Sequence, residues 1–477
     1  MYQLDDFGNK KSDLCTPTST NYGCTKYCTD PYDNCDITRV VDYPYASSTI
    51  NVPIETYYLL NVLTTEMNPG LYNQPAALQA QAIAARSYMG YFLNNPNPDK
   101  PYNNSITYQA FVPFAWDSLN PVSSYTPLEP TTANPCLAGG LSDLQQLVCE
   151  AVAPAYYIAQ VNNNPNFLPA KALFSADIEN QTVDATADKP YFKGVADPIS
   201  TACDANTDFN NAHGIGLSQE GASRWARGNQ CALPGSGNLP WSVRWVNAQQ
   251  ILFHYYTGVH LRAADDNNAI LSPENRWNPL SIAKSGTCPP WMTPGENCIF
   301  TFTVQNTGIH AWDCSNGTTY HLIGWWEDAA GPVSLPAGAQ TPRVSVCGLG
   351  IGESAAYNIT VRPPSNVTGV SSLHFDIERH NASGNFRFSA AGWVDYQIPV
   401  CIGSDLCKRV FLPFVEGADP APTATPTPIP TRTATITQTP TSTPTRTPTR
   451  TPTITRTPTE NCAKGCTLPV TITPPNE

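Results

Sequence analysis

The segment Gln79-Ala-Gln-Ala-Ile-Ala-Ala-Arg-Ser-Tyr88 decides the fold of the first half of the chain. It follows Pro75, and proline is favourable at the first position of a helix because its missing N–H would be unpaired there anyway. Alanines recur along the segment, so another helix or a backbone stretch can approach it closely. Three long polar side chains interrupt this small-residue surface: Gln79, Gln81 and Arg86. Arg86 is either a buried structural partner of a carboxylate or a substrate-binding residue.

A second helix is predicted just before this one, starting at Pro53. Apolar residues at i+3 and i+4 spacing mark its buried face. These are Ile54, Tyr57, Tyr58, Val62 and Leu63. Glu66 continues the stripe where the helix ends, before Asn68-Pro-Gly70. A carboxylate at the apolar end of a helix loses solvation, and its pKa rises toward that of a general acid. On this pattern alone, Glu66 is either such an acid or a partly exposed, ion-paired residue.

The third informative segment is His213-Gly-Ile-Gly-Leu-Ser-Gln-Glu-Gly-Ala222. Its glycines allow a tight turn, and Ser218 can cap a helix that stops at Gly228. The segment lacks the length and the lysine of a phosphate-binding loop. His213 is therefore either a structural residue or part of a binding loop together with Gln219.

These three segments and Ile251-Leu-Phe-His-Tyr-Tyr-Thr-Gly258, in this order, resemble the stage II sporulation protein D / amidase-enhancer family. The resemblance implies an α+β domain at 41–262 that acts on bacterial peptidoglycan as a lytic transglycosylase. Glu66, in its Glu-Met motif, is then the catalytic acid. We expect the substrate-binding residues to be Arg86, Gln79, His213, Gln219 and Ser218.

A single carboxyl group suits this reaction, whereas ordinary glycosidases need two. The acid protonates the bridging oxygen after N-acetylmuramic acid. The resulting carboxylate then takes the proton from the C6 hydroxyl of the same sugar, which leaves a 1,6-anhydro end. No cofactor or metal is expected. The expected partners are peptidoglycan glycan strands and a cell-wall amidase. The alternative is a surface protein that binds the wall or enhances an amidase without cleaving glycan.

Two departures from the family pattern stand out. The stretch Phe174–Thr182 has Glu179 and Asn180 where the family usually has a Gly-Gly turn, and it lacks the His and Cys with which some members hold zinc. A Pro-rich insertion also lies between Phe111 and Gly140.

The range 282–400 changes to short alternating runs such as Cys298-Ile-Phe-Thr-Phe-Thr-Val304, which predict an all-β sandwich. Val304-Gln-Asn-Thr-Gly-Ile-His-Ala-Trp312, followed by Gly324-Trp-Trp326, is similar to the four-tryptophan Ig-like domain. Tryptophans in such a sandwich are either core anchors or a platform on which carbohydrate stacks. Because Trp325 and Trp326 are adjacent in a strand, one of them must face outward, and that ring is the candidate for a sugar or protein contact.

Composition sets the remaining expectations. Only 13% of the 477 residues are charged and the net charge is −12, which argues against nucleic-acid binding. No apolar run is long enough to span a bilayer, so we do not expect an integral membrane protein. The 16 cysteines fall in even groups, for which disulfides between neighbours in an oxidising compartment are expected. The start at Met1 shows no signal-peptide pattern, so either a signal peptide has been removed or the sequence is a fragment, and we expect an exported or cell-surface protein.

The expected organisation is therefore multidomain. A Cys-rich segment (1–40) precedes the α+β domain (41–262), a linker (263–281) and the Ig-like sandwich (282–400). A Cys-closed connector (401–416) leads to a Pro/Thr-rich stalk (417–461), expected to be disordered or polyproline II, and to a Cys-containing tail (462–477).

Overall fold

The computed structural model describes residues 53–95, 109–111, 115–120, 134–161, 168–200, 203, 213–264, 269–286, 288, 291–329, 331–335 and 341–403. The predicted Cys-rich segment, the Pro/Thr-rich stalk, the C-terminal tail and most of the connector lie outside these residues.

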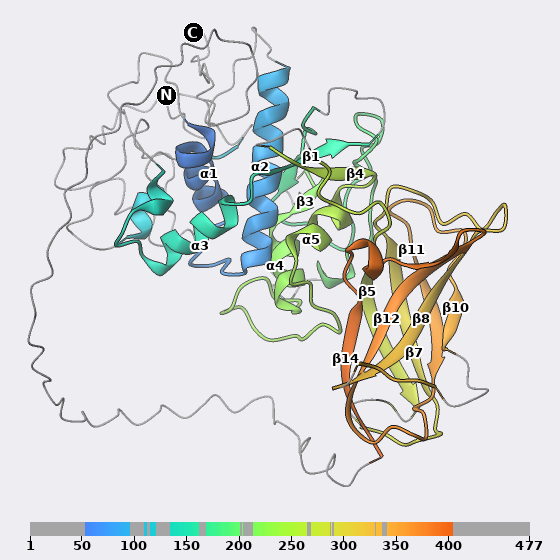
Figure 1. Ribbon diagram of the computed structural model, residues 1–477. Coiled ribbons are helices and arrows are strands. Elements are labelled where there is room, and N and C mark those ends of the chain that lie inside the picture. Colours follow the sequence, from blue (N-terminus) through green and yellow to red (C-terminus); the bar gives the residue numbers. More distant parts are fainter. Residues whose placement is uncertain are drawn as a thin grey trace, which may run out of the picture.

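The first part of the described chain is built around the alanine-rich helix predicted from the sequence. Its helices are α1 (Leu59–Glu66), α2 (Pro75–Asn94), α3 (Asp143–Val152), α4 (Gln219–Arg227) and α5 (Ala248–Tyr255). The other four helices contact α2, whose alanines are buried (Figure 1). The first predicted helix is also confirmed, with a π-helical turn over Ile54–Tyr58 leading into α1.

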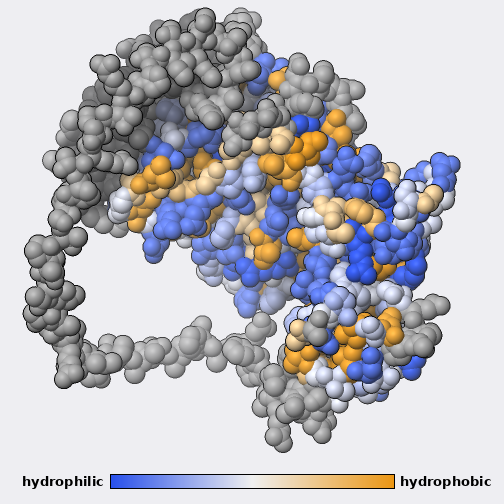
Figure 2. Space-filling model, in the orientation of Figure 1, coloured by the Kyte–Doolittle hydropathy of each residue, from blue (hydrophilic) through white to orange (hydrophobic). Residues whose placement is uncertain are grey.

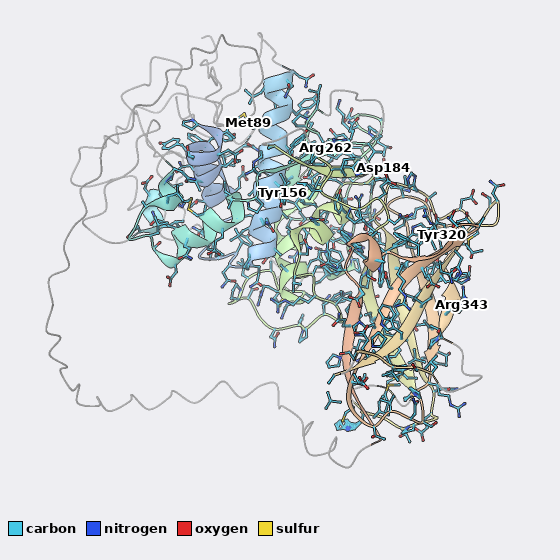
Figure 3. The ribbon with its side chains drawn as sticks, viewed as in Figure 1. Met89, Tyr156, Asp184, Arg262, Tyr320 and Arg343 are labelled. Atoms are coloured by element: carbon cyan, nitrogen blue, oxygen red, sulfur yellow. A yellow bond between two sulfur atoms is a disulfide. The ribbon has the colours of Figure 1, made fainter. Side chains whose placement is uncertain are left out.

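Two small sheets complete this part and make it a mixed α/β unit. Strand β1 (Tyr156–Gln160) pairs antiparallel with β4 (Val259–Ala263), and β2 (Phe174–Ser175) pairs parallel with β3 (Leu217–Ser218). Tyr156 and Arg262 mark the positions of β1 and β4 in Figure 3.

The second part consists of two sheets, which confirms the all-β prediction. One sheet has the order β11 (Ser354–Val361), β7 (Cys298–Asn306) and β5 (Trp277–Gly286). The strands of the other sheet are β6 (Trp291–Met292), β8 (Thr319–Asp328), β9 (Gly331–Pro332), β10 (Arg343–Ser345), β12 (Gly369–Asn381), β13 (Gly384–Arg387) and β14 (Tyr396–Ile402). Its main path runs β10-β8-β12-β14-β6. Phe300 and Phe302 of the first sheet contact Phe375 of the second, with ring centroids 5.1 and 4.6 Å apart, so the two sheets share a core.

The two parts meet closely, and the predicted linker at 263–281 is partly a strand. Strand β5 begins at Trp277, whose side chain is fully buried. Arg276 is buried as well and donates to the carbonyls of Val259, Pro273 and Thr307. Arg276 thus holds the polar stretch before Trp277 between the two parts. The loop-like sequence of this stretch does not indicate these contacts.

Disulfides join neighbouring cysteines, as expected. The described bonds are Cys136–Cys149, Cys203–Cys231, Cys288–Cys298 and Cys314–Cys347. Cys314 and Cys347 both lie in connections between strands, so their bond fixes loops at one end of the sandwich.

The surface of the described part is mixed. Figure 2 shows hydrophilic residues over much of both parts, with smaller hydrophobic patches between them. Over the same residues, no helix combines the length and the apolar character that crossing a membrane requires.

Candidate active site

Glu66 is the last residue of α1 and lies between buried residues of the same chain segment. Leu63 before it and Met67 after it are both fully buried, whereas Glu66 itself is partly exposed. Its Oε1 accepts a hydrogen bond from the main-chain N–H of Ala110 at 2.5 Å, and its Oε2 accepts one from Nε2 of Gln219 at 3.1 Å. The carboxyl group is thus fixed at both oxygens by uncharged donors.

The environment of Glu66 gives it the protonation behaviour of a general acid. Burial raises the pKa of Glu66 to about 7, even though the hydrogen bonds from Ala110 and Gln219 lower it. Desolvation disfavours the charged carboxylate, and neutral donors offset only part of that cost. A carboxyl group with this pKa holds its proton in half of the molecules near neutral pH and can both give and take it.

The segment that presents Ala110 is anchored on α1 and α2. Gln109 is fully buried, accepts a hydrogen bond from the Tyr58 hydroxyl at 2.7 Å and donates to the carbonyl oxygen of Ala85 at 3.1 Å. Phe111 stacks on Tyr58 with ring centroids 5.2 Å apart. These contacts hold the Ala110 N–H over Glu66.

Gln219 is the first residue of α4, and the N-terminus of that helix is tightly built. Ser218 is the N-cap, and its hydroxyl accepts from the N–H of Gly221 at 2.9 Å, as predicted. Ser218 is fully buried, so its hydroxyl serves the helix and does not reach the surface as a substrate contact would. The helix ends at Gly228 in the left-handed conformation, also as predicted.

The loop before α4 forms the expected tight turn. Gly214 and Gly216 both have positive φ, and a Cβ at Gly216 would lie 2.1 Å from the carbonyl oxygen of Leu173. His213 is exposed at the start of this turn, and its Nδ1 accepts from the N–H of Ile215 at 3.0 Å. The loop therefore brings Gln219 to Glu66 and leaves His213 at the surface.

The sequence leaves two roles open for Arg86, a structural one and a substrate-binding one, and its contacts are those of the structural role. Its guanidinium makes two hydrogen bonds to the Glu55 carboxylate, at 2.8 and 2.7 Å. Its terminal nitrogens also donate to three carbonyl oxygens, those of Val152, Pro154 and Tyr156. All three guanidinium nitrogens are thus engaged inside the protein, which corrects the expectation that Arg86 binds substrate.

The two glutamines of α2, Gln79 and Gln81, differ in exposure. Gln79 is partly exposed, in keeping with a contact to an external group. Gln81 is fully buried, and neither atom of its side-chain amide has a hydrogen-bond partner among the residues that the structure describes.

In the second part, Trp325 and Trp326 point to opposite sides of β8. Trp326 is 1% exposed and belongs to the core, so it cannot be a surface contact. Trp325 is partly exposed, stacks on His374 with centroids 5.1 Å apart and lies under the Arg387 guanidinium at 4.2 Å. Trp325 is thus the outward ring of the predicted pair.

Several residues that organise the site carry no sequence signal of this role. Ala110 acts through its main-chain N–H, which any residue would supply. Asp177 lies in the atypical Phe174–Thr182 stretch and binds Arg224 of α4 through both carboxylate oxygens, at 2.6 and 3.1 Å. Asp197 is a buried carboxylate beneath the same helix.

A metal site is not evident in the described part of the chain. Among those residues, His, Cys, Asp and Glu side chains form no group of three that could hold a metal ion.

A mixed α/β domain with one carboxylic acid of raised pKa, held by a main-chain N–H and a glutamine amide, defines a candidate acid–base site. Residues 45–117 match the family described as Stage II sporulation protein, and this range includes α1, α2, Glu66 and Ala110. The chain therefore contains a stage II sporulation protein D-type domain, as the sequence motifs indicated. The family supports a role related to the cell wall.

The other comparisons add no functional information. No curated protein matches the chain. Among solved structures, a Niemann-Pick type C2 protein from the Japanese carpenter ant is similar over 28% of this chain and 96% of its own, with 12% identity and a TM-score of 0.18. A β-glucosidase from Listeria innocua is similar over 29% of this chain and 17% of its own, with 12% identity and a TM-score of 0.16. TM-scores this low support no assignment.

Proposed function

We propose that the chain is an exported lytic transglycosylase that cleaves peptidoglycan glycan strands, with Glu66 as both acid and base. The observation that carries the proposal is the state of Glu66, whose pKa is raised to about 7 by burial while its two oxygens accept hydrogen bonds from neutral groups. A protonated Glu66 can give its proton to the bridging oxygen at N-acetylmuramic acid. The carboxylate so formed can then take the C6 hydroxyl proton of that sugar, so no second carboxylate is needed.

Neutral donors suit this double role. A lysine or arginine beside Glu66 would lower its pKa and keep it ionised, and it could not then act as an acid near neutral pH. The Ala110 N–H and the Gln219 amide instead orient the carboxyl group and stabilise the carboxylate that forms after proton transfer. Gln79 and His213, which are accessible, are the proposed contacts to the sugar strand.

The second part is proposed to be an Ig-like module that contacts the wall through Trp325. Aromatic rings are common partners for the apolar faces of sugars, and Trp325 is the partly exposed ring of the pair. Retention of the full chain on purified cell walls should fall for Trp325→Ala. Unchanged retention of a folded Trp325→Ala protein would contradict this contact.

The cleavage reaction is tested with the full chain and purified, peptide-stripped glycan strands. Mass spectrometry should detect 1,6-anhydromuramic ends with the parent protein and with Glu150→Gln, but not with Glu66→Gln. Glu150 is an exposed residue of α3, so its variant is a matched control for the loss of one carboxyl group. Absence of anhydro ends from the folded parent would overturn the proposal and favour a wall-binding or amidase-enhancing role. A cell-wall amidase assayed with and without the protein would then test that role.

A further inference from the structure

A buried polar chain connects the second part of the molecule to the helix that carries Gln219. It begins at Gln305 on β7, passes through His254 on α5 and ends at Asp197 beneath α4, and all three side chains are at most 1% exposed. His254 Nδ1 lies 2.7 Å from Gln305 Oε1, at hydrogen-bond distance. His254 Nε2 lies 3.4 Å from Asp197 Oδ1, a close polar contact without hydrogen-bond geometry. Figure 1 shows α5 between α4 and the sandwich, where this connection runs.

The orientation of the Gln305 amide is set within the sandwich. Its Nε2 donates to the carbonyl oxygen of Gly352 at 3.3 Å, which leaves Oε1 facing His254. An amide oxygen only accepts, so His254 must carry a proton on Nδ1. Gln305 therefore fixes the orientation of the His254 imidazole between the two parts of the molecule.

Asp197 accepts hydrogen bonds from α4, from α5 and from Ser200 in its own segment. Its Oδ1 accepts from Nε1 of Trp225 on α4 at 2.6 Å, and its Oδ2 accepts from the hydroxyls of Tyr255 and Ser200 at 2.8 and 2.9 Å. Burial alone would raise the pKa of Asp197, but interactions with His254, Tyr255 and Ser200 hold it below its ordinary value. Asp197 is thus a buried carboxylate whose charge depends on its partners.

The first turn of α4 rests directly on this network. A Cβ at Gly221 would lie 2.2 Å from the Tyr255 hydroxyl oxygen and 2.9 Å from Asp197 Oδ2. With so little space, a movement of Asp197 or Tyr255 toward Gly221 would displace the N-terminus of α4. Gln219 lies in the same turn and donates to Glu66.

We propose that Gln305 of the sandwich is a positioning residue for Glu66, acting through His254 and Asp197 on the first turn of α4. The sandwich is then part of the acid–base unit and more than an appended wall-binding module. This inference rests on the proposed function for its kinetic readout, but its effect on Glu66 can be measured without turnover.

The test uses full-length variants and two readouts. Gln305→Leu removes the acceptor for His254 and the donor to Gly352, and Tyr396→Phe is the control. The Tyr396 hydroxyl donates to the carbonyl oxygen of Ser242 at 3.3 Å, so the control removes a different contact between the two parts. The first readout is the titration of the Glu66 carboxyl band by infrared difference spectroscopy, with Glu66→Gln as blank. The second is kcat for glycan cleavage as a function of pH.

If the proposal holds, Gln305→Leu raises the pKa of Glu66, because the Gln219 hydrogen bond that lowers it is weakened. It also lowers kcat about tenfold with little change in KM, as expected for a misplaced catalytic group. Tyr396→Phe should match the parent. Adding Gln305→Leu to Gln219→Leu should have little further effect, since both act through one hydrogen bond.

The contrary results are equally clear. The proposal is overturned if Gln305→Leu leaves the Glu66 titration unchanged while Gln219→Leu shifts it. It is also overturned if Tyr396→Phe reproduces the shift. A parent protein that cleaves no glycan would refute the proposed function alone, because the infrared titration still decides whether Gln305 acts on Glu66.

Discussion

Gln219 donates its side-chain amide to Glu66 Oε2 at 3.1 Å, although 153 positions separate the two residues in the chain. The contact joins the end of α1 to the start of α4. Each helix terminus is set by its own local sequence, and their meeting depends on the packing of both helices against α2.

This contact leads to a prediction about pH dependence. Resting Glu66 must be protonated to act as an acid, so glycan cleavage should fall as the pH rises through about 7. Gln219→Leu removes a donor that stabilises the carboxylate, which raises the pKa and moves this alkaline limb to higher pH. Initial rates of anhydromuropeptide release between about pH 5 and 9 would show the shift. The exposed Gln146→Leu is the control and should follow the parent profile.

Glu66 should also limit stability at alkaline pH. The ordinary pKa of 4.5 is raised to about 7 in the folded protein, so the folded state binds this proton more tightly than the unfolded state. The stabilisation is complete below the lower value and is lost as the pH rises to about 7. Glu66→Gln removes this pH-dependent loss. Its effect on the free energy of unfolding should therefore be more stabilising at pH 8 than at pH 4, by on the order of 3 kcal/mol. Urea unfolding at both pH values measures this, and an equal effect at both would contradict it.

Much of the site could be predicted because it is carried by local patterns. The apolar stripe that ends at Glu66, the alanine-rich helix and the Ser218 cap each follow from a few neighbouring residues, and the structure has all three. The even cysteine groups likewise indicated the pairs that are seen.

The remaining features depend on contacts between distant segments. Ala110 contributes only its main-chain N–H, so its residue type gives no signal. Nothing near Arg86 in sequence shows that three carbonyl oxygens, from the end of α3, the connection after it and the start of β1, surround it. The start of β5 was also missed, because the polar residues before Trp277 are satisfied by Arg276 and by the packing of the two parts.

Arg86 should be a determinant of stability and not of substrate affinity. Arg86→Leu leaves the Val152, Pro154 and Tyr156 carbonyl oxygens without this donor, and we expect a loss on the order of 3 kcal/mol in the free energy of unfolding, since a buried acceptor left unpaired costs about 1–3 kcal/mol. Glu55→Gln should cost less, because the Glu55 side chain is 45% exposed. Denaturant unfolding gives both values. An Arg86→Leu protein of parental stability with a raised KM for glycan would restore the substrate-binding interpretation.

The close packing of α4 on Asp197 makes Gly221 a sensitive position. Alanine is the better helix former by about 1 kcal/mol, so Gly221→Ala would stabilise an isolated helix. Here the added Cβ would lie 2.2 Å from the Tyr255 hydroxyl oxygen, which must move and strain its hydrogen bond to Asp197. Overpacking of this kind costs about 1–3 kcal/mol, and the displaced helix should also weaken the bond from Gln219 to Glu66. Thermal unfolding and the pH profile of cleavage should therefore change together. Gly235→Ala, with open space around the new Cβ, should change neither, and a Gly221→Ala protein as stable as the parent would show that the first turn of α4 is not held by Asp197.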